Sequence, residues 1–339
     1  MRDRPEQSPT SASPRSGALL RRIGGAALSL VLVLWGAATL SFLAFRVLPG
    51  DPVSVMLGPQ AQVSEAVKAG IRADLGLDRP IWQQYLSMLG DLLRGDLGTS
   101  YQLRMPVSEV IGRQLGATLQ LTGAALAIAV LLALAGVLIA RRPLARGLLA
   151  AAELIVLSSP VFWIGLLLLT VFAFGLGWFP VAGSRTGAGL VLPAVTLALP
   201  VAALLGQVLR DGVEAAERQP WALSVRARGA DHARLTLRHT LRHGSLGALT
   251  LSAYLVGSLL GGAVLVETVF ARPGLGRVAL AAITGRDLPV VTGIILFSAL
   301  VFVIVNTLVE LAAPFLDPRL RTSATPVADA APARPEAGR

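Results

Sequence analysis

Six long stretches without a single charged residue constrain the fold of this chain more than any other feature. They cover 23–45, 114–140, 154–184, 186–209, 243–266 and 288–309. An α-helix rises roughly 1.5 Å per residue, so about 20 residues cross the ~30 Å hydrocarbon core of a bilayer. Each run is that long, and 54% of the residues are hydrophobic, with a mean hydropathy of +0.66. The sequence therefore predicts an all-α membrane protein with six transmembrane helices.

The first run follows Arg21 and Arg22, as the apolar region of a secretory signal peptide would. Such a region has about 7–15 residues and ends at a small-residue cleavage site. This run is longer and continues into FRVLPGDP, residues 45–52, which contains no such site. We interpret it as a first span that is not cleaved.

The distribution of charge predicts the orientation and argues against nucleic acid as a partner. The net charge is +10, but the basic residues are spread along the loops. Segments 1–22, 141–153, 210–242 and 310–339 carry most of them, whereas 46–113 has as many acidic as basic residues. Short basic loops stay in the cytoplasm, and long segments cross largely regardless of charge. Both termini and the 210–242 loop are therefore predicted to be cytoplasmic, and 46–113 external.

The chain divides into one transmembrane domain, 19–321, between two tails. Residues 1–18 and 322–339 lack apolar periodicity and are rich in Pro with Ser or Ala, so we expect disordered cytoplasmic tails. The external segment 46–113 contains helix-start signals at Ser64 with Glu65 and at Pro80. It is predicted to hold two or three short helices.

The residues present argue against several kinds of chemistry. The chain has no cysteine, and its one lysine, Lys68, is followed by Ala69, so a phosphate-binding loop with Lys-Ser or Lys-Thr is absent. His239 and His243 have helical spacing, but Arg238 and Arg242 alternate with them and would repel a metal ion. We predict no cofactor, no metal site and no catalytic activity.

The six uncharged runs contain no acidic residue, and their one histidine, His243, stands at the very start of the fifth run. Proton-coupled carriers tend to keep ionisable groups within their spans, so the energy source is expected to be a partner. Glu267 lies at the outer end of the fifth run. We interpret it as a structural acid paired with Arg272 or Arg277 rather than as a substrate ligand.

The basic segment between the fourth and fifth runs has helix signals on both sides of a glycine. Pro220 and Trp221 begin one short helix, and Gly229 stands where a helix commonly ends. Asp231 is suited to cap a second helix, whose Arg234, Arg238 and Arg242 would share one face. Three interpretations compete: a solvated basic loop against lipid phosphates, an amphipathic surface anchor, and a docking element for a cytoplasmic partner.

Residues 224–243, SVRARGADHARLTLRHTLRH, resemble the EAA loop of the permease subunits of ABC importers in the dipeptide, oligopeptide and nickel family. The positions that match are Arg226, Ala227, Arg228, Gly229, Arg238, His239, Leu241 and Arg242. The similarity extends over roughly 18–321 through eight segments in order: LPGDP (48–52), LGLDRPIWQQYL (75–86), RGDLGTS (94–100), SSPVFWIGLLLL (158–169), LGWFP (176–180), LPAVTLALP (192–200), GGAVLVETVFARPGLGR (261–277) and LDPRLR (316–321). Leu246 and Gly247 stand where the family has Ile-Pro.

The resemblance implies a type I ABC-importer permease fold in a bacterial or archaeal inner membrane, importing peptides or a related small solute. The implied partners are a second permease subunit, two cytoplasmic ATPase subunits and an external solute-binding protein. The implied ATPase-docking residues are Trp221, Arg226, Ala227, Arg228, Gly229 and Asp231. Polar residues proposed for the translocation path are Gln120, Ser159, Thr196, Gln207 and Asn306. The alternative is a membrane scaffold or signalling protein with a cytoplasmic docking loop.

Overall fold

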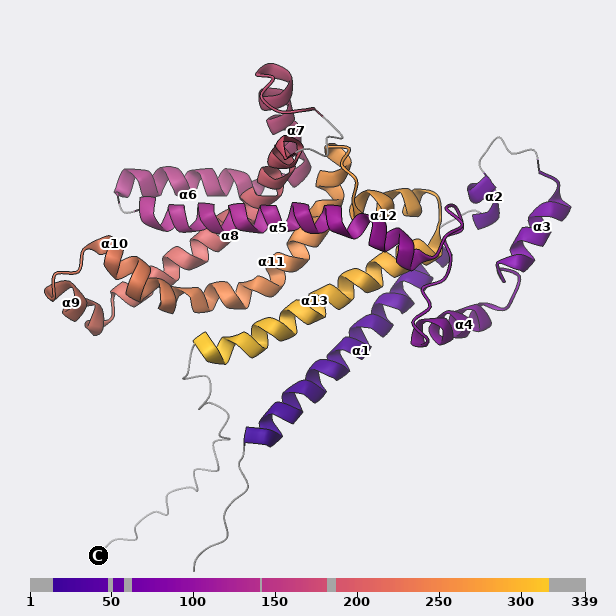
Figure 1. Ribbon diagram of the computed structural model, residues 1–339, viewed down its shortest axis with the longest axis horizontal. Helices are drawn as coiled ribbons and strands as arrows, with labels where there is room; N and C mark the ends of the chain where they lie inside the picture. Colours follow the sequence, from indigo (N-terminus) through magenta and orange to yellow (C-terminus); the bar gives the residue numbers. More distant parts are fainter. Residues whose placement is uncertain (1–14, 48–50, 58–62, 141, 182–186, 317–339) are drawn as a thin grey trace, which may run out of the picture.

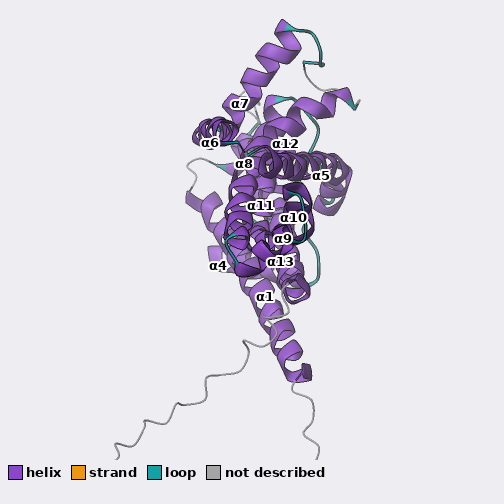
Figure 2. Ribbon diagram, turned by 90° about the vertical axis from the view of Figure 1, so that its left-hand side faces the viewer, coloured by secondary structure: helices purple, strands orange, loops and turns teal. Residues whose placement is uncertain are grey.

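The computed structural model describes residues 15–47, 51–57, 63–140, 142–181 and 187–316, and these form helices joined by short loops (Figure 1). No β-strand occurs among these residues (Figure 2). The fold is therefore all-α, as the sequence predicts. Residues 1–14 and 322–339, assigned to the two tails, lie outside the described residues, and α1 begins at Arg15, inside the predicted tail.

Four helices are long and apolar enough to cross a membrane, and each covers all or nearly all of one of the six predicted runs. They are α1 (Arg15–Val47), α5 (Val107–Ile139), α8 (Ala188–Glu217) and α13 (Leu288–Leu316). The fifth run, 243–266, lies in α11 (Leu241–Val269). The long apolar helices agree with a multi-pass membrane protein.

The third run, 154–184, does not form one continuous helix. The chain instead folds into α6 (Pro143–Ser158) and α7 (Val161–Leu168), which continues into the π-helical segment η1 (Leu169–Gly175). The helix axis bends by 109° between the two arms. Pro160 causes the break, because it has no N–H and forces the preceding residue out of the helical region, and Ser159 accordingly has φ −95° and ψ 136°. This pair is one bent span or a re-entrant loop, so the described helices give four spans, or five with the pair.

Small residues form the contacts at the centre of the molecule, where α8 packs between α5 and α11. Ala125, Ala129 and Ala133 recur every four residues on α5 and are buried. Ala194 and Ala198 form a similar buried stripe on α8. Stripes of small residues allow helices to approach closely in lipid, where association depends on fit. The Ala-rich composition of the second run thus has a structural use.

Short helices lie at both ends of the long ones. The segment before α5 holds α2 (Pro52–Leu57), α3 (Glu65–Asp74) and α4 (Ile81–Leu93), which confirms the expectation of two or three short helices in 46–113. A helix that the sequence analysis did not predict, α12 (Leu275–Thr284), connects α11 to α13. At the opposite end of the molecule lie α9 (Pro220–Ala227) and α10 (His232–Leu235) (Figure 1).

Candidate functional site

The predicted helix–glycine–helix arrangement is present at the end of the molecule that carries α9. Gly229 has φ +81°, a left-handed conformation that favours glycine. The Gly229 N–H donates to the Arg226 carbonyl at 2.9 Å and the Ala230 N–H to the Val225 carbonyl at 3.4 Å. These two bonds form a Schellman motif, which satisfies the last carbonyls of α9 and turns the chain sharply.

Helix α9 is fixed to α8 on one face and open on the other. Ala222 is fully buried, and Arg226 forms an ion pair with Glu217 of α8 at 3.0 Å. Leu223, in contrast, has 71% of its surface exposed, and Ser224, Ala227 and Arg228 are exposed beside it. Trp221 is half-buried at the start of the helix. The arrangement presents a small mixed apolar and basic surface at the tip of the loop.

The second helix departs from the expected straight helix. Asp231 caps it as predicted, since its carboxylate accepts a hydrogen bond from the Arg234 N–H at 2.9 Å. After α10, however, the chain forms a π-helical segment, η2 (Thr236–Thr240), before α11 begins. A π-helix is wider than an α-helix, so the i, i+4 register that would align Arg234, Arg238 and Arg242 is not kept. All three side chains are nevertheless exposed.

Ion pairs continue from this loop into the bent pair. Arg146 of α6 contacts Glu214 of α8, and Arg210 of α8 makes two hydrogen bonds to Glu153 of α6. Glu153 and Arg210 are largely buried, and the Arg210 Nη1–Glu153 Oε1 distance is 2.8 Å. The sequence analysis missed this pair because each residue only marks the end of an apolar run, and the two lie 57 residues apart.

The proposed path residues come from four parts of the chain, and their environments differ. Gln120 on α5 is exposed, while Gln207 on α8 and Asn306 on α13 are half-buried. Ser159 lies at the break between α6 and α7, with its hydroxyl bonded to the Ile155 carbonyl. Thr196 is fully buried and its hydroxyl donates to the Leu192 carbonyl at 2.8 Å. In this conformation, Thr196 is therefore not available to line a translocation path. The other four residues are at least partly exposed.

Glu267 is a structural acid, but its partners differ from those expected. The carboxylate is fully buried and accepts hydrogen bonds from the Thr118 hydroxyl at 2.6 Å and the Gly276 and Arg277 N–H groups at 2.8 and 3.2 Å. The Thr118 hydroxyl also accepts the Leu275 N–H at 2.8 Å. Three N–H groups at the start of α12 are thus satisfied by α5 and α11. The expected pairing with the Arg272 or Arg277 guanidinium is replaced by these backbone contacts.

A second buried carboxylate, Asp287, connects α13 to the loop before α5. It accepts hydrogen bonds from the Ser100 hydroxyl and from the N–H groups of Tyr101 and Gln102, the latter two at 3.2 Å. Burial and the Asp287 charge raise the pKa of the Tyr101 phenol. No sequence signal identified Asp287, because its partners lie more than 180 residues away.

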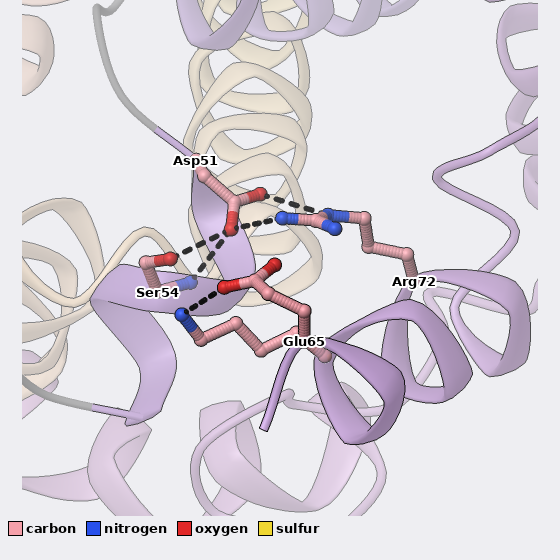
Figure 3. Close-up of polar contacts among 5 residues, drawn as sticks. Asp51, Ser54, Glu65 and Arg72 are labelled. Atoms are coloured by element: carbon pink, nitrogen blue, oxygen red, sulfur yellow. Dashed lines mark hydrogen bonds and ion pairs between the residues drawn. The ribbon is translucent and has the colours of Figure 1, made fainter. Parts of the chain in front are cut away.

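A third polar cluster holds α2 against α3 (Figure 3). The Asp51 carboxylate caps α2 through the Ser54 N–H and hydroxyl, at 3.1 and 2.8 Å, and pairs with Arg72 of α3 at 2.8 Å. The Arg72 guanidinium and the Ser54 bonds lower the pKa of Asp51 to about 2. Lys68 pairs with Glu65 at 2.7 Å beside it. Within the described ranges, no three His, Cys, Asp or Glu residues lie close enough to hold a metal ion.

Long apolar helices and a basic loop with a sharp glycine turn define a multi-pass helical membrane protein. Comparison with known families is more specific. Residues 126–322 match the model described as binding-protein-dependent transport system inner membrane component, and residues 17–122 match the N-terminal model of the same group. The chain belongs to this family, and it is a multi-pass protein of the inner membrane.

Curated relatives align over nearly their whole length. The glutathione transport system permease protein GsiC of Salmonella paratyphi A is 34% identical over 308 residues, and the di/tripeptide transport system permease protein DppB of Pseudomonas aeruginosa is 34% identical over 337. A putative peptide transport system permease protein of Brucella abortus is 35% identical over 315 residues. Each alignment covers 89% of this chain and 98% of the relative. These matches support transport and give no support to the scaffold alternative.

Proposed function

We propose that the chain forms half of the translocation path of an ATP-driven importer for peptides or a related small solute such as glutathione. A second permease subunit would complete the path, an external solute-binding protein would deliver the solute, and two cytoplasmic ATPase subunits would hydrolyse ATP. The observation that carries this proposal is the loop of α9, Gly229 and α10. It combines an exposed surface with an ion pair to α8 and a buried alanine, Ala222.

The attachment suggests how ATPase movement would reach the spans. A partner that contacts α9 at Trp221, Leu223 and Arg228 would move α8 as well, because the Arg226–Glu217 pair and the buried Ala222 hold the two helices together. From α8 the Arg210–Glu153 pair leads to α6. Differential contacts of α9 with two ATPase states would then bias the helices between inward and outward openings.

The polar residues Gln120, Ser159, Gln207 and Asn306 are our candidates for the path wall. Thr196 belongs to it only in a conformation in which α7 separates from α8, because here its methyl group faces Gly165 of α7. A Cβ at Gly165 would lie 3.2 Å from Thr196 Cγ2. Such close packing is a contact that opening would have to break.

Replacement of Gly229 tests the docking proposal. A Cβ at this position meets no atom within 4 Å, so a substitution there acts through the backbone angle and not through a clash. Gly229→Val should cost about 1–2 kcal/mol locally and tilt α9. In reconstituted vesicles containing all subunits, we expect reduced uptake and reduced stimulation of ATP hydrolysis, with normal membrane insertion and pairing.

Two variants control this experiment. Gly229→Asn should retain most coupling, because Asn adopts the left-handed conformation more readily than Val. Arg234→Gln removes one exposed charge without altering the turn. A solvated basic loop would instead tolerate Gly229→Val and lose function gradually with each arginine. Wild-type coupling in Gly229→Val would remove the docking proposal.

Single cysteines test the proposed orientation, in which α9 and both termini are cytoplasmic and α2 to α4 are external. Ser224 and Arg94 are exposed and suitable positions, whereas Ser100 is buried against Asp287 and would report poorly. We expect an impermeant thiol reagent to reach the residue 94 cysteine only from outside and the residue 224 cysteine only from inside. Labelling of both from the same side would contradict the topology.

A further inference from the structure

Helix α4 has an apolar strip that the described part of the chain leaves uncovered. Trp82, Leu86, Leu89 and Leu93 follow one another at i, i+4, i+7 and i+11, which places them on one face of the helix. Trp82 is 63% exposed, Leu86 57% and Leu93 90%, and Leu89 is half-buried between them. Four large apolar side chains on one face are unusual for a helix that simply faces water.

The side of α4 next to the strip is held against the carboxyl-terminal part of α1. The Tyr85 hydroxyl forms a 2.8 Å hydrogen bond with Thr39, and its ring packs on Phe42 with centroids 5.4 Å apart. Gln84 accepts a hydrogen bond from Arg46. Further along the same side, Ser87, Met88 and Leu92 line a cavity of about 720 Å³ that α1 and α13 close from the other side. These contacts fix the rotation of α4, so its apolar strip points away from the helices.

The contacts also fix the depth of α4. The apolar part of α1 is Gly24–Val47, roughly 36 Å long for a hydrocarbon core of about 30 Å. Thr39 lies eight residues before the end of this helix, roughly 12 Å along its axis. A helix bonded to α1 at Thr39, Phe42 and Arg46 therefore lies where hydrocarbon gives way to head groups. Figure 1 shows α4 beside this end of α1 and at an angle to it.

The surroundings of the strip match a lipid surface. Leu40, Leu43 and Val47 of α1 are exposed at the same level. A helix that crosses the membrane presents such residues to lipid, so α4 is bonded to a helix that already has this partner. Arg79 and Arg94 flank α4 at its two ends and are exposed. Their positions suit phosphate groups, and tryptophan is enriched at this depth.

We propose that α4 is an interfacial helix whose strip of Trp82, Leu86, Leu89 and Leu93 inserts into the leaflet at the carboxyl end of α1. Under the proposed orientation this is the outer leaflet. The insertion would hold the α2 to α4 segment flat on the membrane beside the external opening, with the cavity side facing the helices. The partner is the lipid surface itself, and neither the solute-binding protein nor another subunit is needed to cover the strip.

Nitroxide labels on single cysteines test this directly, since the chain has no native cysteine. Labels at residues 82, 86 and 93, in the full transporter reconstituted in liposomes, should be more accessible to oxygen than to a water-soluble nickel complex. A label at Ser87, exposed on the cavity side, should show the reverse. Leu223, an equally exposed leucine on α9, is the matched control and should not show the lipid pattern.

Two outcomes would overturn the proposal. Access of the strip labels to the nickel complex, as at Ser87, would mean that the strip faces water. Shielding from both reagents would mean that a protein subunit covers it. If labelled variants do not fold, native Trp82 gives a second measurement: the fluorescence lost in Trp82→Phe should be quenched by lipids brominated near their glycerol end. Failure of that quenching would equally reject insertion.

Discussion

Gly276→Ala should prevent the chain from accumulating as a folded membrane protein. A Cβ on Gly276 would overlap the backbone of Val264, well inside van der Waals contact, and would approach the Glu267 carboxylate to 3.0 Å. The clash is with main-chain atoms, so no side chain can rotate to relieve it. The N-terminus of α12 would have to move away from α11, and the carboxylate would lose its backbone donors. We expect little or no monodisperse protein after detergent extraction, compared with a normal wild-type peak.

Variants of Glu267 separate the loss of hydrogen bonds from the steric effect. Glu267→Ala leaves the Gly276 and Arg277 N–H groups and the Thr118 hydroxyl without their acceptor in a buried site. Unsatisfied buried groups cost about 1–3 kcal/mol each, so the expected loss of stability is about 3–5 kcal/mol. Glu267→Gln retains one acceptor oxygen, so it should lose less stability than Glu267→Ala.

The neighbouring Thr268→Ala is the matched control for these variants. Thr268 is exposed and its hydroxyl bonds only to the Val264 carbonyl of its own helix, so thermal unfolding in detergent should be nearly unchanged. If Glu267→Ala unfolds at the temperature of Thr268→Ala, the carboxylate does not hold α12, and the structural role assigned to it is wrong.

The parts of the fold that depend on neighbours in sequence could be predicted. A run of about 20 apolar residues determines a membrane helix by itself, and α1, α5, α8 and α13 follow the runs. The turn at Gly229 was predictable for the same reason, because a glycine followed by Asp231 is a local signal. The short helices α3 and α4 also began where Ser64 and Pro80 indicate.

The parts of the fold that depend on residues far away in the sequence could not be predicted. Proline interrupts the helix at Pro160. At Pro193 and Pro200 it does not, and both lie inside the continuous helix α8. The residue type is the same in each case, so the surrounding helices decide the outcome. The π-helical segment η2 likewise has no periodic signal in the sequence, and it disrupted the expected face of arginines. Buried acids at the ends of runs, such as Glu153 and Asp287, could not be identified from the sequence because their partners are far along the chain.

The pair formed by Glu153 and Arg210 leads to the second prediction with a large expected effect. Arg210→Met should lower the free energy of unfolding by about 3–5 kcal/mol, because removing one partner leaves a buried charge uncompensated. The side chains of Glu153 and Arg210 are only 8% and 12% exposed. Gly136 and Gly206 lie beside the guanidinium, where added Cβ atoms would meet Nη1 at 3.4 and 3.2 Å. There is little room for water to replace the lost partner.

The arginine that directly follows α8 gives a matched control. Arg218 pairs with Glu214 at 3.4 Å but is 78% exposed, and exposed pairs contribute about 0–1 kcal/mol. Arg218→Met should therefore unfold close to the wild-type temperature in a detergent melt, well above Arg210→Met. The double variant Glu153→Leu with Arg210→Met should recover most of the lost stability, because apolar residues of similar volume can replace a buried ion pair.

The double variant also separates stability from coupling. If the pair transmits movement from α8 to α6, the stable double variant should still show lower uptake for each ATP hydrolysed, since an apolar contact lacks the two directed hydrogen bonds of the guanidinium. Recovery of both stability and transport would assign the pair to stability alone and would move the route of coupling elsewhere. Equal unfolding temperatures for Arg210→Met and Arg218→Met would instead show that the buried pair adds nothing to the fold, contrary to its burial and geometry.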